Sequence, residues 1–182
     1  MTSKAIFSAV VGMILLAGVG GCQTGSPEIV GAEAALARDA GSAAFLDRVS
    51  SQPTVSENDA MRGVLLLMDG EDRAVTFGQR VSSLMDRGVV PAQWSFQAGR
   101  PATKGKLAYM IYSACQMRGG VVLWLTGPSQ RYCLREMQYQ GVMSEGPVGA
   151  EITGMEFAAV LARADAYLQE GKVPQVLRNV PD

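Results

Sequence analysis

The sequence predicts a mainly α fold, in which two to three helix–loop–helix repeats of about fifty residues pack into one compact domain. Two observations lead to this prediction. Three segments begin with Ser or Thr and continue with apolar residues at helical spacing, and their starts lie 47 and 50 residues apart. Two other helical segments each end at a glycine that is followed by apolar residues and a proline-containing loop.

The three repeated helix starts are Ser56, Thr103 and Thr153. We expect each to be an N-cap, whose side-chain oxygen accepts a backbone N–H of the first turn. Glu156 lies three residues after Thr153 and is expected to complete a capping box there. In register, the positions four, seven and eight residues later form the stripe of a core-facing helix. These positions hold Ala60, Gly63, Val64, Leu107, Met110, Ile111, Phe157, Val160 and Leu161.

The two helices that end at glycine precede the second and third helix starts, within residues 77–91 and 131–147. Gly88 and Gly141 stand where a helix favours a left-handed residue after its last turn. The apolar faces of these helices comprise Val81, Leu84 and Met85 in the first, and Cys133, Leu134 and Met137 in the second. The predicted unit is therefore a helix, a glycine stop, a loop of about a dozen residues and a capped helix.

Residues 121–125 interrupt this helical pattern with the sequence VVLWL. Their bulky side chains favour extended backbone, which predicts one short strand or a buried extended connector. One strand makes no sheet, so the predicted class remains mainly α.

The amino-terminal segment predicts export. Lys4 precedes an uncharged apolar stretch from Ala5 to Val19, which is shorter than the roughly twenty residues of a membrane span. The following VGGC, with polar residues after it, resembles the lipobox of bacterial lipoproteins. That resemblance implies cleavage after residue 21 and acylation of Cys22, for example with palmitate. Gln23, rather than Asp, implies sorting to an outer membrane where the cell has one, with the protein facing the periplasm or the surface. The alternative is an ordinary signal peptide or an uncleaved anchor with a coincidental cysteine.

The predicted organisation of the 182 residues has four parts. Residues 1–21 are a lipoprotein signal peptide, and residues 22–54 hold the lipidated cysteine, a tether and a lead-in helix. Residues 55–170 form the helical repeat domain, and residues 171–182 form a tail.

The repeat unit resembles the S-layer homology domain over about residues 45–168. The second unit reads LMDRGVVPAQWSFQAGRPATKGKLAYMIYSA and the third reads LREMQYQGVMSEGPVGAEITGMEFAAVLARA, whereas only VSENDAMRGVLLL is legible in the first. In that family an Arg after the capping Thr contacts an anionic wall polysaccharide. Here its place holds Glu57, Lys104 and Gly154, so only Lys104 is basic. The resemblance implies an envelope protein that interacts with another envelope protein or with a wall or surface polysaccharide.

One basic cluster suggests an alternative function. Arg100, Lys104 and Lys106 surround a loop that also carries Trp94 and Phe96. Cations beside aromatic rings at a helix N-terminus could hold an anionic or sugar ligand. The cluster therefore predicts a small-ligand or sugar-binding module, against the simpler interpretation of a solvated loop whose aromatic rings join the core.

The composition argues against catalysis and against nucleic-acid binding. The chain has no histidine, so it lacks the commonest general base and the commonest metal ligand, and we expect no metal and no cofactor. Its acidic residues show no pairing across a cleft, and its formal net charge is −1 without a basic stripe. We therefore expect a protein that is not an enzyme and binds no nucleic acid.

Two cysteines remain besides Cys22. Cys115 and Cys133 both fall on apolar helical faces. In an exported, oxidising compartment they could form a disulfide between the second and third units. They could equally be two buried small apolar residues.

Overall fold

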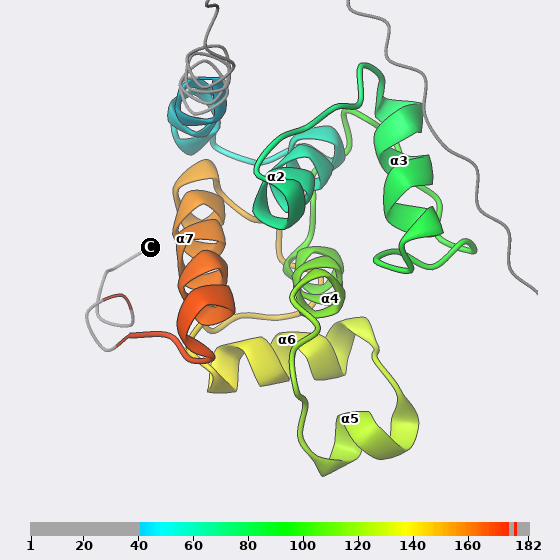
Figure 1. Ribbon diagram of the computed structural model, residues 1–182, viewed down its shortest axis with the longest axis vertical. Helices are drawn as coiled ribbons and strands as arrows, with labels where there is room; N and C mark the ends of the chain where they lie inside the picture. The colour runs from blue at the N-terminus through cyan, green and yellow to red at the C-terminus, as the bar shows by residue number, and fades with distance from the viewer. Residues whose placement is uncertain (1–40, 175–176, 178–182) are drawn as a thin grey trace, which may run out of the picture.

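The computed structural model of the protein describes residues 41–174 and 177. The regular secondary structure of this part of the chain is helical, apart from isolated β-bridges, which confirms the mainly α class (Figure 1). Its helices are residues 41–50, α2 (Glu57–Asp69), α3 (Phe77–Asp86), α4 (Lys104–Ala114), α5 (Val121–Thr126), α6 (Gln130–Tyr139) and α7 (Gly154–Glu170). The predicted signal peptide, Cys22 and residues 23–40 of the tether lie outside the described residues.

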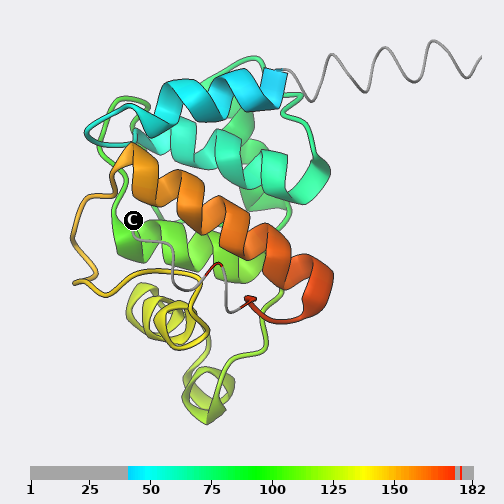
Figure 2. The same ribbon diagram turned by 90° about the vertical axis from the view of Figure 1, so that its left-hand side faces the viewer.

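The helices form three outer–inner pairs around one centre. The inner helices α2, α4 and α7 surround the centre, while helix 41–50, α3 and α6 lie outside them (Figures 1 and 2). The outer helix of each unit packs on the inner helix of the unit before it, so α3 lies on α2 and α6 lies on α4. Helix 41–50 closes the ring by lying at the start of α7.

A closed ring of backbone hydrogen bonds joins the three units at the centre. Val55 N–H donates to the Ile152 carbonyl (3.0 Å), Ile152 N–H donates to the Ala102 carbonyl (3.2 Å), and Ala102 N–H donates to the Val55 carbonyl (2.8 Å). Each of these buried residues immediately precedes an N-cap. The sequence repeat therefore corresponds to an approximate threefold arrangement in space.

The predicted helix boundaries follow from local chemistry. Ser56, Thr103 and Thr153 are the N-caps of α2, α4 and α7, and each side chain accepts the backbone N–H three residues on. Gly88 and Gly141 have φ of 69° and 75°, the left-handed conformation that glycine adopts most easily. The apolar residues of the predicted inner stripe are all buried: Ala60, Gly63, Val64, Leu107, Met110, Ile111, Phe157, Val160 and Leu161.

The strand predicted near residues 121–125 is wrong, because this segment is the short helix α5. Gly120 and Gly127 bound it, and the Gly127 N–H donates to the Leu123 carbonyl at 3.0 Å. Within the described part of the chain no neighbouring strand is available, so the backbone satisfies its hydrogen bonds locally instead.

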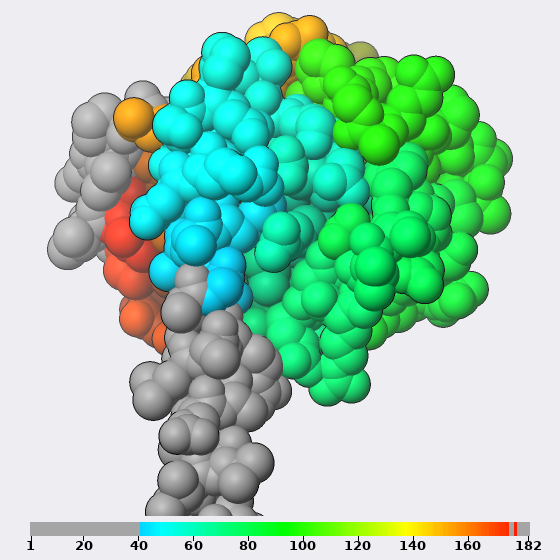
Figure 3. All heavy atoms as spheres, turned by 90° about the horizontal axis from the view of Figure 1, so that it is seen from above, coloured from blue at the N-terminus to red at the C-terminus, as the bar shows by residue number. Residues whose placement is uncertain are grey.

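The core begins earlier than the predicted domain boundary at residue 55. Helix 41–50 buries Phe45 and Val49, which are 3% and 0% exposed. Its surface fits against the neighbouring units in the space-filling view (Figure 3). At the other end, Val173 is also buried. None of the helices in residues 41–174 is long and apolar enough to cross a bilayer.

Candidate functional site

The position after each N-cap, where the resembling family carries its ligand-binding Arg, lies at a junction between units. Glu57 and Lys104 are 2% and 7% exposed, and Gly154 is buried. Each backbone N–H at this position donates across the junction, to the carbonyls of Arg100, Ala150 and Gln52 respectively. In this chain the position therefore joins units.

Lys104 forms the junction between the second and third units. Its Nζ lies 2.6 Å from Glu156 Oε1, and both side chains are less than 10% exposed. The same ammonium donates to Ser144 Oγ and to the Glu145 carbonyl, each at 3.0 Å. Ser144 Oγ in turn donates to the Glu156 carboxylate. A buried ion pair needs such extra hydrogen bonds to offset the cost of desolvating both charges.

Glu57 forms the junction between the first and second units, with the charges reversed. Its Oε1 lies 2.6 Å from Lys106 Nζ, and its Oε2 accepts the Gln97 N–H at 2.7 Å. Arg100 Nε lies 3.3 Å from Oε1, close enough for attraction but not aligned for a hydrogen bond. Lys106 also lies 5.0 Å from the centre of the Phe96 ring.

The third junction, between the third and first units, leaves no room for a side chain at Gly154. A Cβ there would lie 1.8 Å from the Val49 carbonyl oxygen, because the end of helix 41–50 occupies that space. The ion pair of this junction comes from the outer helix instead, with Arg48 Nη2 3.0 Å from Asp59 Oδ1. Asp59 takes the place three residues after the cap that Lys106 and Glu156 take in the other units.

These junctions change two interpretations drawn from the sequence. Arg100, Lys104 and Lys106 do not form an open cationic site, because all three interact with buried carboxylates. Glu156 does not complete a capping box, because its carboxylate pairs with Lys104 across the junction. The Thr153 half of the cap remains, with Oγ1 accepting the Glu156 N–H at 3.2 Å.

A groove of about 450 Å³ lies between the loop after α3 and the start of α6. Trp94 and Tyr109 form its aromatic side, with ring centres 4.9 Å apart and planes tilted by 52°. Both rings are half-buried, so each presents part of its face. We call this the Trp94 groove; its lining residues are Pro91, Gln93, Trp94, Tyr109, Pro128, Ser129, Gln130, Arg131 and Val148.

The Trp94 groove combines aromatic rings with unengaged polar groups. Arg131 is exposed and makes no ion pair within the described residues, and Gln93 and Gln130 supply amide groups. No acidic side chain is among the described residues that line it. Of the residues predicted for ligand binding, the structure brings only Trp94 to this groove. Arg131 and Tyr109 escaped prediction because they lie far from Trp94 in sequence, and no local motif links them.

Cys115 and Cys133 are both buried and free. Of the two alternatives left open by the sequence, a disulfide or two buried small apolar residues, the structure has the second. The two thiols have different neighbours. The charge of Asp165 in α7 contributes to the raised pKa of Cys115, whereas Cys133 contributes to the raised pKa of Tyr109 and Tyr112 in α4. Burial raises the pKa of Cys115 to about 12 and that of Cys133 to about 11. Such thiols are poor nucleophiles near neutral pH.

A second buried network escaped prediction. Asp72, whose side chain is 3% exposed, accepts Arg80 Nε at 2.6 Å and the Ala74 N–H at 3.0 Å. Arg80 also donates to Asn58 at 3.0 Å and thereby fixes the loop between α2 and α3. Thr76 and Gln79 of α3 form a full capping box, a pattern that is visible in the sequence.

Comparison of the chain with protein-family models, with curated proteins and with solved structures found no match. Among residues 41–174 and 177, no group of three or more His, Cys, Asp or Glu side chains could hold a metal ion. The function must therefore be inferred from the site itself.

Proposed function

We propose that this protein is a non-catalytic cell-envelope lipoprotein whose helical repeat domain binds an anionic wall or surface polysaccharide in the Trp94 groove. The predicted acylation of Cys22 would place the domain at a membrane, as a periplasmic or surface-facing protein. Acyl chains and a folded binding domain together make an anchored receptor for an envelope polymer.

The observation that carries this proposal is the juxtaposition of Trp94 and Tyr109 with the unpaired Arg131. A pyranose ring presents C–H groups that pack on aromatic faces, while its hydroxyls need donors and acceptors such as Gln93 and Gln130. Arg131 presents a planar fork of donors that suits a carboxylate or phosphate on the sugar. An open groove also suits a chain better than a small enclosed ligand.

Of the three equivalent positions in the inner helices of the described domain, one carries an aromatic ring that could stack on a sugar. The Tyr109 position, six residues after the N-cap, holds Arg62 in α2 and Ala159 in α7. The other two inner helices thus lack the aromatic side chain. The proposed site is therefore specific to the interface between the second and third units.

Pull-down of the purified protein with purified wall and surface polysaccharides tests this proposal. Trp94→Ala is expected to weaken binding about tenfold, because it removes one stacking face. Arg131→Gln should weaken binding to the anionic polymer about tenfold and leave binding to a neutral polymer nearly unchanged. Trp124→Ala, which removes the other indole, a side chain that does not line the groove, is the matched control.

Equal glycan binding by Trp94→Ala and Trp124→Ala would contradict the proposed site. Complete absence of glycan binding, with co-purification of an envelope protein, would replace the polymer with a protein partner. Labelling with radioactive palmitate tests the anchor separately: the label should disappear in Cys22→Ala, and unchanged labelling would exclude acylation at Cys22.

A further inference from the structure

The short helix α5 exposes most of its apolar side chains. Val121, Trp124 and Leu125 are 73%, 81% and 69% exposed, and Val122 is 51% exposed. Only Leu123 is buried, where the helix docks on α6. Single exposed apolar residues are ordinary, but four in one six-residue helix form a patch that folding of the domain does not explain.

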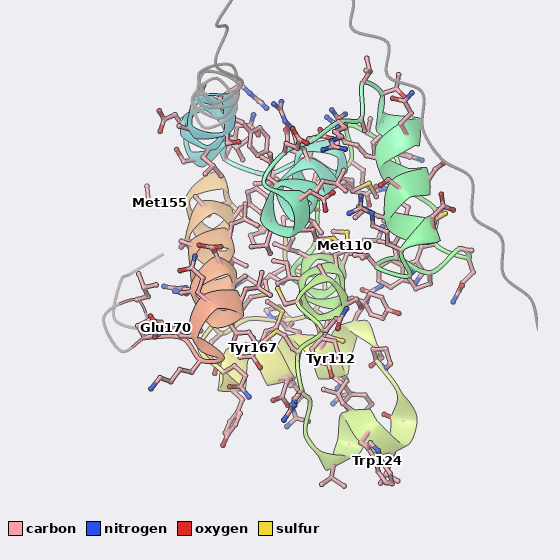
Figure 4. All side chains as sticks on the ribbon, viewed as in Figure 1. Met110, Tyr112, Trp124, Met155, Tyr167 and Glu170 are labelled. Atoms are coloured by element: carbon pink, nitrogen blue, oxygen red, sulfur yellow. The ribbon has the colours of Figure 1, made fainter. Side chains whose placement is uncertain are left out.

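The patch projects from one end of the molecule. α5 lies beyond α6, at the end of the domain opposite helix 41–50 (Figures 1 and 2). Trp124 lies at the outer edge of the molecule (Figure 4). A flat surface approaching this end would therefore meet α5 first.

Two arginines flank the patch. Arg135 lines a hollow together with Val121 of α5, and Arg118 precedes α5 by three residues in the chain. Both are exposed and form no ion pair within residues 41–174. The acidic Glu136 is only partly exposed, and its carboxylate accepts the Gly120 N–H at 3.2 Å and the Gln140 amide at 3.0 Å. The surface around α5 is therefore both apolar and positively charged.

From this combination we infer that α5 inserts into the interface of an anionic lipid bilayer. Trp favours the boundary between headgroups and acyl chains, and aliphatic neighbours enter the outer acyl region. Arginines at the rim lie level with the anionic headgroups, each contributing to binding at low salt. The inserted side chains are Val121, Val122, Trp124 and Leu125, with Arg118 and Arg135 at the rim.

A second protein surface fits the patch less well. A stable protein interface buries about 800 Å² on each partner and involves 20 to 30 residues a side. One six-residue helix falls far short of this, whereas interfacial insertion needs only a small apolar wedge with basic flanks.

The predicted anchor is compatible with this contact. Eighteen residues separate Cys22 from residue 41, and a chain of that length spans at most about 60 Å. A domain of this size has an expected radius of gyration of about 14 Å, so this length exceeds its expected diameter. Lipidated Cys22 and α5 could thus engage the same membrane.

The two tryptophans of the chain provide a test with an internal control. In the full-length protein, Trp94→Phe leaves Trp124 as the single indole, and Trp124→Phe leaves Trp94. Each variant is mixed with vesicles of phosphatidylglycerol or of phosphatidylcholine whose acyl chains carry bromine, a contact quencher of indole fluorescence. Any anchor brings both indoles to the vesicle, so the difference between the variants reports on α5 itself.

We expect Trp124 to be quenched and blue-shifted in phosphatidylglycerol vesicles, while Trp94 is not. In the Trp94→Phe background, Arg118→Gln and Arg135→Gln should each lower the equilibrium constant for insertion about fivefold at low salt. Leu125→Ser should lower it about tenfold.

Equal quenching of the two indoles, or none of Trp124, would overturn the inference. Equal quenching of Trp124 by both lipids would overturn the role of anionic headgroups. A spectral shift of Trp124 that depends on protein concentration without vesicles would identify a second copy as the occupant. Vesicle quenching tests membrane insertion of α5, whereas the pull-down with the Trp94 and Arg131 variants tests polysaccharide binding. The two measurements are independent, so either proposal can fail while the other holds.

Discussion

The junctions of the second unit with its two neighbours use one geometry with opposite charges. Lys104 after the cap meets Glu156 of the next unit, whereas Glu57 at the equivalent position meets Lys106. The architecture thus specifies a pair of charges at each junction and leaves their sign open. The reversed signs also discriminate between neighbours, because Glu57 placed against Glu156 would bring two carboxylates together. We interpret the reversal as a device that fixes the order of units around the ring.

The two junctions also differ in their exposure and in their remaining partners. Both members of the Lys104–Glu156 pair are nearly inaccessible, whereas Lys106 is 18% exposed. Glu57 keeps Arg100 and the Gln97 N–H as further partners, whereas Glu156 keeps the Ser144 hydroxyl as its side-chain partner within the described residues. Loss of the lysine should therefore cost more at the second-to-third junction.

The largest expected effect comes from breaking that junction. Lys104→Met should lower the free energy of unfolding by about 3–5 kcal/mol, because Glu156 is left as a buried charge without a cation. Urea denaturation measures the loss. Lys104→Met combined with Glu156→Leu should recover most of it, since a buried apolar pair is often as stable as a buried ion pair. If Lys104→Met lowered the free energy of unfolding no more than Lys106→Met does, the two junctions would not differ in the way we infer.

A pH titration separates the junctions from the packed thiols. Burial raises the pKa of Cys133 to about 11 and that of Cys115 to about 12, above their ordinary value of 9.0. The unfolded chain therefore loses these protons first, so the stabilisation is complete below pH 9 and falls as the pH rises toward the folded values.

Between about pH 9 and 10 the free energy of unfolding should fall by about 2 kcal/mol for the two thiols together, because the unfolded thiols are only half ionised at pH 9. Urea denaturation across this interval measures the slope; Tyr109 and Tyr112 contribute less over it because their ordinary pKa of 10.0 lies at its upper end. The double variant Cys115→Ala, Cys133→Ala should flatten it. The same slope in that variant would assign the effect to Tyr109 and Tyr112 instead, since burial also raises their pKa.

The first-to-second junction should yield a smaller loss. Lys106→Met is expected to cost about 1–3 kcal/mol, because Glu57 retains Arg100 and a backbone donor. The exchange Glu57→Lys with Lys106→Glu tests whether the sign is free, and it should restore part of the stability lost in Glu57→Lys alone. No recovery in the urea midpoint would show that the loop around Gln97 requires the carboxylate.

The smallest effect belongs to the junction closed by helix 41–50. Arg48→Ala should cost about 0.2–1 kcal/mol, because the Arg48 side chain is 51% exposed and water screens its pair with Asp59. Thermal unfolding followed by circular dichroism measures this difference. A loss as large as that of Lys104→Met would mean that this exposed pair contributes as much as a buried one.

The repeat was predictable because local rules and packing agree within it. Ser56, Thr103 and Thr153 predict the helix starts because their side chains suit the N-cap position. The spacing of the apolar residues after them predicts the buried face of each helix. The partners of Lys104 and Glu156 were not predictable, since a side chain's contact across a junction depends on how the units are arranged. Trp94 was identifiable as an aromatic in a loop, whereas Arg131 joined it only through folding. The β-favouring side chains of residues 121–125 led to the prediction of a strand. The segment forms the short helix α5 instead, because a helix satisfies its backbone hydrogen bonds without a neighbouring strand.

The central ring of hydrogen bonds has a consequence for the folding of the chain during its synthesis. The bonds join Val55 near the beginning of the domain to Ile152 near its end, and helix 41–50 rests against Gly154. A chain that stops before Ile152 can form just one of the three bonds, so the ring cannot close until nearly all of the domain is present. A nascent chain thus lacks this closure until nearly all of the domain has been synthesised, so the final shape of the domain is fixed late.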